Sequence, residues 1–534
     1  MASFISRGLF GRSSSFHNIR PVYSFSSLNQ QRYFKREYHS SRALWNGSID
    51  QIEQKAMKGD ALSQSKLGEC YFEGKDGKVK DYKTAREWFQ KAADQKEPNA
   101  YYHLGVMYDH GYGMDKDEEN AIEHFHYAAD LGHTEAIYQV ALFYLQVNGN
   151  DSKSLAMEYM SRAAKQGHVD AQYQLGVLLD NAESSIRNTE KSHYWIRKAA
   201  YRDHLEAQAY LANMYYCGIG TEKDEKEAFV WYEKAASEGH LDSQHALGLA
   251  YRDGSYYDKD ITIAEKWFTL ASDKGSEQSK YELAMIYYKG LNGTTDLQKA
   301  FDLFKKSAEL GYPLGQFTIG MFYATGEIVQ KDISIAIGWL EKAAEQNIDD
   351  AQFNLGVLYD IGDGVEKDDK KAAYWYRKAA ELGHSEAKCN LGVMYSTGTG
   401  VELSYKDALQ WYTEAAQEGH AEAQFNLGSM YHDGEGIDND FEAAFFWFKQ
   451  AADQGFPSAQ YNVGVLSREG VGIEKNESLA FEYMLKSANN NVIEGIEDLI
   501  SMYQNGIGTN KNMEAAKEWK QKLDILNNQS DALE

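Results

Sequence analysis

The stretch Asp349–His384, DDAQFNLGVLYDIGDGVEKDDKKAAYWYRKAAELGH, contains one complete folding unit. Its first part places Ala351, Leu355 and Leu358 on one helix face, because they follow one another at steps of four and three residues. The glycines of the segment GDG then end that helix and open a turn. A second apolar set with helical spacing follows, namely Ala372, Trp375, Tyr376, Ala379 and Ala380. The unit is therefore a pair of helices, which we call the A helix and the B helix.

One position of the B helix recurs along the chain with a period of 36 residues, and we call it the tryptophan position. It holds Trp195, Trp231, Trp267, Trp339, Trp375, Trp411, Trp447 and Trp519. Leu303 and Tyr483 fill the skipped slots, and Trp88, His124 and Tyr159 continue the series toward the N-terminus at steps of 36 and 35 residues. A period this regular indicates about thirteen stacked copies of one helix pair.

The start of the B helix is marked in every copy. Seven residues before the tryptophan position lies an Asp, Asn or Ser, whose side chain caps the free N–H groups of a first helical turn. These predicted caps are Asp81, Asp117, Ser152, Asn188, Asp224, Asp260, Asp296, Asp332, Asp368, Ser404, Asp440, Asn476 and Asn512. We expect the loss of one cap to cost about 1 kcal/mol.

The end of the B helix is marked by a residue suited to the left-handed backbone conformation, eight positions after the tryptophan position. Glycine occupies it at Gly132, Gly167, Gly239, Gly275, Gly311, Gly383, Gly419 and Gly455. Asp203, Asn347 and Asn491 are substitutes that tolerate this conformation. Lys96 breaks the pattern, so we expect the first unit to be closed differently.

Large and small residues alternate on the B helix. Trp375 and Tyr376 lie one turn before two alanines, which predicts an interlocking seam between adjacent helix pairs. Two turns between A and B helices depart from the pattern. The turn of residues 145–152 is one residue short, and neither it nor the turn at 181–187 carries the glycine pair. We therefore expect a kink or a change of curvature near residues 145–190.

The repeated pattern A-x-x-x-L-G-x-x-Y-x-x-G-x-G, a capping Asp, and A-x-x-W-Y-x-K-A-A-x-x-G-H resembles the Sel1-like repeat. Examples are Ala351–His384, Ala387–His420 and Ala423–Gly455. This family is similar to the tetratricopeptide repeats, with a longer unit. The resemblance covers residues 61–528 and implies an all-α, right-handed superhelix of about thirteen helix pairs. It also implies an adaptor or scaffold, without a ligand common to the family.

The first forty residues differ in composition from the rest. They carry six Arg and Lys residues, nine serines and no acidic residue before Glu37, which is typical of an organelle transit peptide. The segment Arg36–Tyr38 resembles the R-x-Y site of the matrix processing peptidase. We therefore expect a disordered mitochondrial presequence at residues 1–38, cleaved near Tyr38, and a protein of the mitochondrial matrix. The alternative is a basic tail on a cytoplasmic protein. Residues 39–60 then form a linker and 529–534 a C-terminal tail.

Composition excludes several functions. The net charge is −25 although the N-terminal segment is basic, so the repeats are strongly acidic, which argues against binding nucleic acid or anionic lipid. No segment has 18 consecutive apolar residues, so we expect no stable membrane insertion. The three cysteines, Cys70, Cys217 and Cys389, are too far apart for a disulfide framework or a metal-binding pattern.

Candidate sites for chemistry are explained by the repeat. The segments GDG, GTG and GEG follow no strand and carry no P-loop lysine, so we interpret them as turns rather than phosphate sites. A histidine series could suggest metal binding: His133, His168, His204, His240, His384 and His420. Equivalent residues of adjacent helix pairs lie about 10 Å apart, whereas zinc needs its ligands at about 2 Å. We therefore expect turn residues, no metal, no cofactor and no catalytic residue.

The position before the Leu-Gly pair is the strongest candidate for binding. It holds asparagine in four consecutive repeats, at Asn354, Asn390, Asn426 and Asn462. In the related tetratricopeptide repeats this part of the A helix lines a concave groove that holds extended peptides. An Asn amide both donates and accepts, so a row of them can bind a peptide backbone without demanding a sequence. The alternative is a solvated or self-bonded ladder of asparagines with no ligand.

These patterns predict a non-enzymatic protein-interaction scaffold or adaptor in mitochondria, such as an assembly or quality-control factor. Its expected partners are proteins that offer basic or extended peptide segments. An alternative is a stress-signalling relay, in which the protein stays in the cytosol when mitochondrial import fails. A hydrolase is the remote third class, because no nucleophile with a neighbouring base is visible in the sequence.

Overall fold

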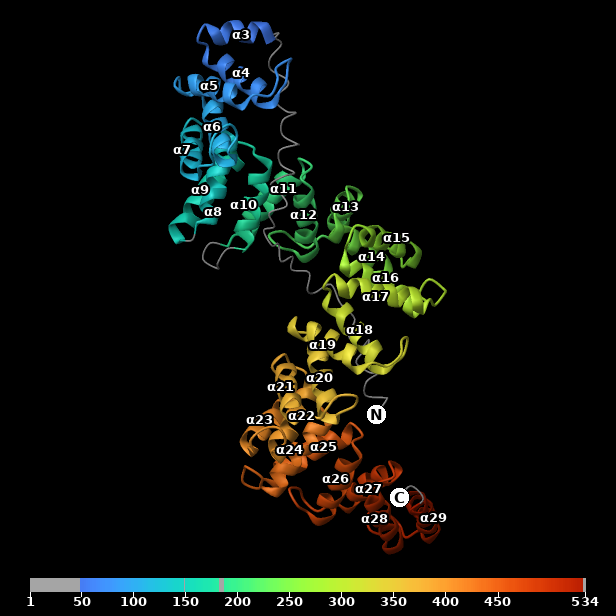
Figure 1. Ribbon diagram of the computed structural model, residues 1–534. Helices are drawn as coiled ribbons and strands as arrows, with labels where there is room; N and C mark the ends of the chain where they lie inside the picture. Colours follow the sequence, from blue (N-terminus) through green and yellow to red (C-terminus); the bar gives the residue numbers. More distant parts are fainter. Residues whose placement is uncertain (1–48, 148, 182–186, 532–534) are drawn as a thin grey trace. The chain divides into compact units, whose positions relative to one another are not determined.

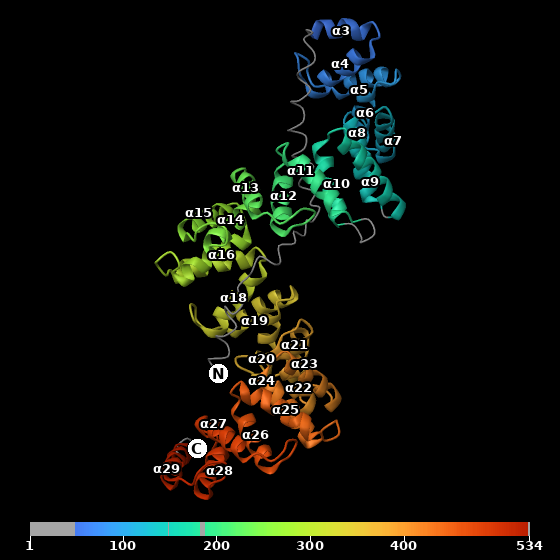
Figure 2. The ribbon, with the colours of Figure 1, turned by 180° about the vertical axis from the view of Figure 1, so that it is seen from behind.

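The computed structural model describes residues 49–531 except 148 and 182–186, and every regular element in these residues is an α-helix. The A helices are α4 (Ala61–Glu73), α6 (Pro98–His110), α8 (Thr134–Gln146), α10 (Val169–Asn181), α12 (Leu205–Cys217), α14 (Leu241–Asp253), α16 (Glu277–Lys289), α18 (Pro313–Thr325), α20 (Asp349–Ile361), α22 (Ser385–Thr397), α24 (Ala421–Asp433), α26 (Pro457–Glu469) and α28 (Ile493–Asn505). Figures 1 and 2 show these helices following one another in chain order.

The B helices alternate with them. They are α5 (Tyr82–Ala93), α7 (Glu118–Asp130), α9 (Asn150–Lys165), α11 (Thr189–Ala200), α13 (Glu225–Ser237), α15 (Ile261–Asp273), α17 (Leu297–Glu309), α19 (Ile333–Glu345), α21 (Asp369–Glu381), α23 (Tyr405–Gln417), α25 (Phe441–Asp453), α27 (Glu477–Asn489) and α29 (Met513–Asp531). The predicted all-α solenoid of helix pairs is confirmed. The chain forms two compact units, one up to Ser279 and one from Lys280 onward, which are described separately.

The tryptophan position forms the predicted seam, but it is not the deepest position of the B helix. Trp375 is half-buried and packs against two cores, that of the preceding helix pair and that of its own. The residue after it, Tyr376, is only 1% exposed. Its ring lies against Gly356 of α20, where an added Cβ would come within 2.5 Å of it. The Leu-Gly glycine therefore makes room within a pair, while the tryptophan joins neighbouring pairs.

The predicted caps are confirmed with one exception. Twelve of the thirteen side chains accept a hydrogen bond from a backbone N–H of the first turn of their B helix. The predicted cap at Ser152 was wrong, because α9 begins at Asn150 and Ser152 lies inside its first turn. Only three residues separate α8 from α9, where seven separate α20 from α21. The shorter turn moves the helix start ahead of the serine.

The expectation for Lys96 was also wrong. Its φ angle is 60°, equal to that of Asp203 at the equivalent position. The N–H groups of Lys96 and Glu97 donate to the carbonyls of Ala93 and Ala92, as in the other turns of this kind. These two hydrogen bonds set the backbone conformation, so the first unit closes like the others despite a side chain that disfavours the left-handed region.

The first and last described helices, α3 and α29 (Met513–Asp531), resemble B helices with modified sequences. Residues 39–60, which the sequence suggested as a linker, include helix α3 (Ile49–Met57), which packs on α4 through Ile52 and Ala56. Gln64 of α4 donates to the carbonyl of Ala56, as Gln352 does to Ala344 of a full B helix. At the other end, Leu523 and Asp524 of α29 stand where the other B helices carry two small residues.

The irregular region at residues 145–190 lies in the compact unit that ends at Ser279. The predicted kink falls partly on residues 148 and 182–186, which are outside the described residues, and it stays a prediction. At the end of α10, Asp180 accepts hydrogen bonds from Arg187 at 3.1 Å and from Tyr210 of α12 at 2.7 Å. These side-chain contacts link the end of α10 to the residue before the next cap and to the following A helix.

Candidate protein-binding surface on the A helices

The solvent-facing side of an A helix is a narrow stripe. In α20 the residues Ala351, Gln352, Leu355, Gly356, Leu358 and Tyr359 are buried. Asp350, Asn354 and Val357 are partly exposed, and Ile361 is 52% exposed. Steps of four, three and four residues place these side chains on one face of the helix. The asparagine of each repeat therefore lies in the middle of the stripe that meets solvent.

The structure places the four predicted asparagines at one equivalent position of α20, α22, α24 and α26, all within the unit that begins at Lys280. Each of Asn354, Asn390, Asn426 and Asn462 is partly buried. We call this set the asparagine row. It forms a repeated feature across four neighbouring A helices.

Part of the row's hydrogen-bonding capacity is used within the protein. Asn354 Nδ2 donates to the carbonyl of Asp350 at 2.7 Å, and Asn426 Nδ2 lies 3.9 Å from Cys389 Sγ on the preceding A helix. Burial raises the pKa of the Cys389 thiol to about 12, so the sulfur that Asn426 contacts is neutral. Among the described residues, nothing hydrogen-bonds to the Asn462 amide or to the Asn354 Oδ1. The side chain of Asn390 also hydrogen-bonds to Tyr376, so three of the four asparagines make contacts within the protein. The self-bonded alternative thus accounts for most of the row, and the Asn462 amide and the Asn354 Oδ1 remain for a ligand.

Two further rows flank the asparagines. Four residues before them lie Asp350, Glu386 and Glu422, followed by Ser458. Three residues after them lie Val357, Val393, Ser429 and Val465, of which Val393 is 37% exposed. The A-helix face of repeats 349–492 therefore has an acidic edge, a central amide row and a largely apolar edge. We use the name "A-helix face" for these three rows.

The predicted histidine series occupies the turns, as expected, and has a role that the sequence analysis missed. His384 Nδ1 accepts the N–H of Ala387, so it caps α22, and its Nε2 lies 3.4 Å from the Asp350 carboxylate of the preceding repeat. Its ring stacks on Phe353 at 4.4 Å. The same cap occurs at His133, His168, His204, His240 and His420. The constant spacing between histidine and the start of the A helix was the available signal.

The histidines are therefore structural. An Nδ1 that accepts a backbone N–H is unprotonated. At His168, His204, His240 and His384, the Nε2 lies 2.8–3.4 Å from a carboxylate of the preceding repeat. Within the described part of the chain, no group of three His, Cys, Asp or Glu side chains is placed to hold a metal ion.

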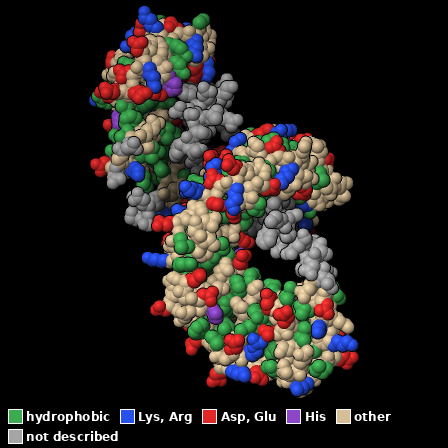
Figure 3. All heavy atoms as spheres, turned by 60° about the horizontal axis from the view of Figure 1, so that its bottom comes forward, with side chains coloured by type: hydrophobic (Ala, Val, Ile, Leu, Met, Phe, Trp, Pro, Cys, Tyr) green, Lys and Arg blue, Asp and Glu red, His purple; other side chains and the backbone are tan. Residues whose placement is uncertain are grey.

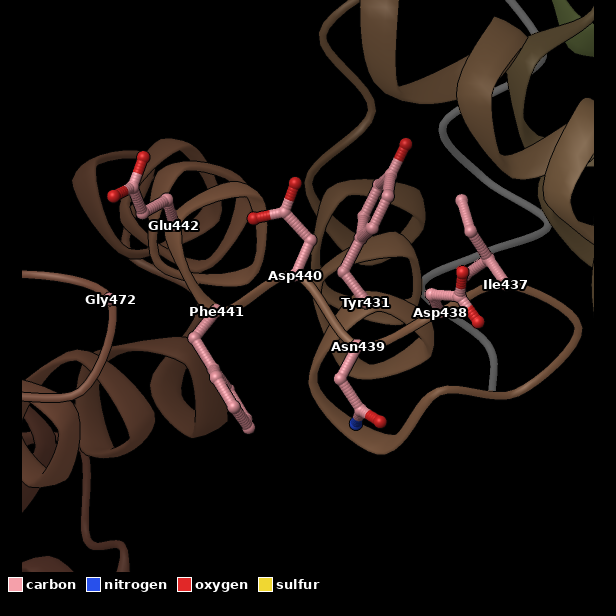
Figure 4. A pocket seen from close by; sticks show the side chains of 8 residues that line it. All are labelled: Tyr431, Ile437, Asp438, Asn439, Asp440, Phe441, Glu442 and Gly472. Carbon is pink, nitrogen blue, oxygen red and sulfur yellow. The ribbon is translucent and has the colours of Figure 1, made fainter.

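The glycine pairs of the turns serve close packing. Gly472 has a φ angle of 69°, and a Cβ there would collide with the carbonyl of Phe441 at the start of the preceding B helix. A pocket lies at this joint, lined by Tyr431, Ile437, Asp438, Asn439, Asp440, Phe441, Glu442 and Gly472. Figure 4 shows that the side chains of Phe441, Glu442 and Tyr431 point in different directions. Asp440 is engaged as the cap of α25, so we interpret the pocket as a hollow between successive turns.

The surface carries both charges. Figure 3 shows acidic, basic and hydrophobic side chains interspersed over the face that it presents. In the part of the chain that the structure describes, no helix has the length and apolar character needed to cross a membrane.

A comparison with protein families identifies the repeat. The Sel1 repeat matches the chain in thirteen copies, at residues 61–97, 98–133, 134–168, 169–204, 205–240, 241–276, 278–312, 313–348, 349–384, 385–420, 421–456, 457–492 and 501–522. Two known proteins share shorter segments. The ERAD-associated E3 ubiquitin-protein ligase component HRD3B of Arabidopsis thaliana is 32% identical over 108 residues, which are 20% of this chain and 15% of that protein. Protein sel-1 homolog 2 of Mus musculus is 35% identical over 81 residues, 15% of this chain and 11% of that protein.

One solved structure is similar over most of the chain. The protein c5321, a protective antigen present in uropathogenic Escherichia coli strains and displaying an SLR fold, is 30% identical, with a TM-score of 0.58. The similarity covers 90% of this chain and 94% of that one. Sel1-repeat proteins are scaffolds that bind other proteins, and no enzyme family is indicated. The thirteen matched copies show that this chain belongs to the Sel1-repeat family.

Proposed function

We propose that this protein is a non-catalytic scaffold of the mitochondrial matrix that binds extended segments of client proteins on its A-helix face. The observation that carries the proposal is the asparagine row. Four half-buried amides stand at one equivalent position of four neighbouring A helices, in the stripe that meets solvent. The groups of this row that make no hydrogen bond within the protein, the Asn462 amide and the Asn354 Oδ1, can bond to a peptide backbone as donor and acceptor.

The two edges of the face add selectivity. Val393, at 37% exposure, and its equivalents give apolar contact area, and burying such a side chain contributes up to about 2 kcal/mol. Glu386 and Glu422 place negative charge on the other edge, which favours basic clients. The strongly acidic repeats reinforce this preference through their long-range field.

The matrix location rests on the N-terminal composition. Residues 1–38 lie outside the described residues, so this part of the proposal depends on their arginines, serines and the Arg36–Tyr38 segment alone. HRD3B is named as a component of a ubiquitin ligase, and this chain covers 15% of its length. From that similarity we infer a role within a larger assembly, either in quality control or in complex assembly.

Site-specific photo-crosslinking tests the binding surface. A photo-reactive residue at Val393 should capture clients, because this side chain stands exposed in the A-helix face. A matched control is the same residue at Phe446, which is 51% exposed on the B helix α25. Capture of the same clients with equal yield at both positions, or none at Val393, would refute the proposal.

An import-coupled signalling relay is the second candidate, because it needs the same presequence and the same binding repeats. Collapse of the mitochondrial membrane potential separates the two. A matrix scaffold should leave an uncleaved precursor that is degraded. A stable cytosolic precursor that gains a new partner would instead support the relay.

A further inference from the structure

The solvent-facing side of the B helix α11 differs in charge from the rest of this acidic chain. Steps of three and four residues place its exposed side chains on one face of the helix. We call these six residues the α11 stripe: Lys191, Tyr194, Arg197, Lys198, Tyr201 and Arg202. The stripe carries four cations and no carboxylate, and the one acidic residue of α11, Glu190, lies in its first turn. In a protein with a net charge of −25, this helix therefore presents a local positive surface.

Two of the four cations have no counter-ion within the protein. Neither Lys191 nor Arg197 forms an ion pair with any residue that the structure describes. The equivalent of Arg197 in α25 is Lys449, which pairs with Asp453 four residues later at 2.6 Å. In α11 that later position holds Tyr201, and Arg197 Cζ lies 5.5 Å from the centre of the tyrosine ring. Seven other B helices carry an acid there, namely Asp94, Asp130, Asp273, Glu309, Glu345, Glu381 and Asp453.

The other two cations are explained by packing within the solenoid. Lys198 Nζ lies 5.2 Å from the ring centre of Trp195, a contact that recurs between the equivalent residues of α5, α13, α19 and α29. Arg202 donates to the carbonyl of Gly167 at the end of the preceding B helix. Lys191 and Arg197 are therefore the cations of the stripe that the fold does not explain.

The two tyrosines of the stripe supply contact area between the charges. Tyr194 is 50% exposed and Tyr201 is 60% exposed. Each ring is held edge-on at 5.0 Å from a tryptophan, Tyr194 against Trp195 and Tyr201 against Trp231 of α13. A ring that is already held in place loses little conformational entropy when a partner covers it. Tyrosine and arginine are also the residues enriched in protein interfaces and in their hot spots.

Exposed carboxylates on the two neighbouring B helices limit the width of the positive surface. Glu158 of α9 and Glu227 and Glu233 of α13 are exposed at positions equivalent to three of the stripe. The helix α11 has 12 residues and is about 18 Å long. A membrane surface or a nucleic-acid duplex is wider than one helix, so it meets these carboxylates as well as the cations. A short acidic segment of a protein that lies along α11 meets the cations alone.

We propose that the α11 stripe docks a short acidic segment of a partner protein. The carboxylates of this segment pair with Lys191 and Arg197, and its chain covers the rings of Tyr194 and Tyr201. The stripe lies in the compact unit that ends at Ser279, whereas the asparagine row lies in the other unit. The inference goes beyond the proposed function and does not rest on it, because the two surfaces are built from different helices and take ligands of opposite charge.

Fluorescence anisotropy with the full chain tests the inference. The probe is a labelled twelve-residue peptide in which glutamate alternates with serine, and the control peptide carries glutamine in place of each glutamate. We expect the glutamate peptide to bind and the glutamine peptide to bind far more weakly. Lys191→Gln combined with Arg197→Gln should weaken binding of the glutamate peptide at least about fivefold, because it removes the two unpaired cations.

The helix α17 provides the matched control variant. It exposes Lys305 and Lys306 at the positions of Arg197 and Lys198, but Asp302 and Glu309 take the places of the two tyrosines. Lys305→Gln combined with Lys306→Gln removes the same charge and should change the affinity by less than about twofold. The basic N-terminal segment is present in both double variants, so a difference between them reports on α11. Equal weakening in both variants, or no binding of the glutamate peptide to the parent chain, would overturn the inference.

Exchange of the tyrosines provides a second variant. Tyr194→Asp combined with Tyr201→Glu gives α11 the charge pattern of α17 and should abolish binding of the glutamate peptide, with a melting temperature close to that of the parent chain. Binding that survives this exchange would contradict the proposed site. A single-stranded oligonucleotide and vesicles of phosphatidylcholine with phosphatidylserine serve as competing probes. If either one binds more tightly than the peptide and loses its binding in the Lys191→Gln, Arg197→Gln variant, the proposed acidic protein segment is the wrong occupant.

Discussion

Repeats 349–492 and repeats 134–204 build the same kind of helix pair with different joints. In the first group, each A helix is followed by a seven-residue turn whose second glycine packs on the preceding B helix. In the second group, α8 and α9 are joined by three residues, and Asp180 holds Arg187 and Tyr210 by side-chain hydrogen bonds. A turn that packs through its backbone and a glycine can recur in the same form in successive repeats. A contact made by particular side chains occurs only where those residues are present.

This difference explains where a repeated surface can form. Identical joints keep equivalent residues in register, so the asparagine row spans four repeats. Next to the short turn, Phe143, Val147 and Leu155 are instead left 36%, 41% and 37% exposed. The regular repeats are therefore suited to a periodic ligand, and the irregular ones present a surface that occurs once in the described residues.

The largest expected effect is loss of a backbone joint. Gly400→Ala should cost at least about 3 kcal/mol, because φ is 71° and a Cβ would collide with the Asp369 carbonyl of the preceding repeat. Gly383→Ala is the control, since its φ is 97° but its surroundings are open, and it should cost about 1–2 kcal/mol. Urea denaturation of the full chain, with hydrogen exchange to locate the change, measures both. Equal losses would argue against the close approach.

Acid should weaken the unit that ends at Ser279. Burial lowers the pKa of both His245 and His133 to about 4. The unfolded chain takes up these protons below pH 6.5 while the folded chain does not, so stability is lost between pH 6.5 and 4. At pH 5 the loss is about 2 kcal/mol for each histidine.

Urea denaturation at pH 7 and pH 5, with hydrogen exchange of the full chain to locate the change, measures this effect. In His245→Gln the loss between the two pH values should shrink by about 2 kcal/mol. A variant that loses as much stability as the parent protein on acidification would show that His245 is not the group responsible.

Removing a predicted cap should have a smaller effect on stability, and this effect should differ between the two groups of repeats. Asp368→Ala removes a cap that accepts two backbone N–H groups and should cost about 1 kcal/mol. Ser152→Ala should cost less than about 0.5 kcal/mol, because Ser152 lies inside α9 and caps nothing. Thermal unfolding of both variants gives the comparison. A loss at Ser152 as large as at Asp368 would restore the original cap assignment.

The smallest effect should be a gain. Lys96→Gly should stabilise the first repeat by about 0.5–1 kcal/mol, since Lys96 has a φ of 60° that favours glycine. Hydrogen exchange of α5 and α6 measures it. No gain, or a loss, would show that the lysine side chain contributes contacts that outweigh the backbone cost.

Most of the fold could be predicted from the sequence, because the period carries it. Tyr376 could be placed on the B helix because it directly follows the tryptophan position at Trp375. The cap at Asp368 could be placed because it lies seven residues before that position. Ser152 could not be placed, because counting back from Tyr159 assumes a turn of constant length. Lys96 could not be predicted either, since the turn is fixed by backbone hydrogen bonds that a residue type does not reveal.

Less of the candidate surface could be predicted from the sequence. The row Asn354–Asn462 was visible as a repeated letter, but its half-buried position and its contact with Cys389 depend on how neighbouring A helices pack. The capping role of His384 was missed because histidine is an uncommon cap and its Nδ1 acceptor role depends on a tautomer.

The most direct test of the account is capture of clients by the doubly substituted chain Asn390→Ala, Asn426→Ala, with the photo-reactive residue at Val393. The matched control is Gln410→Ala with Phe446→Ala, two exposed positions on the B helices α23 and α25. The account predicts that capture falls severalfold in the asparagine variant alone, while the melting temperatures of both variants stay close to that of the parent chain. Undiminished capture by the asparagine variant would contradict it.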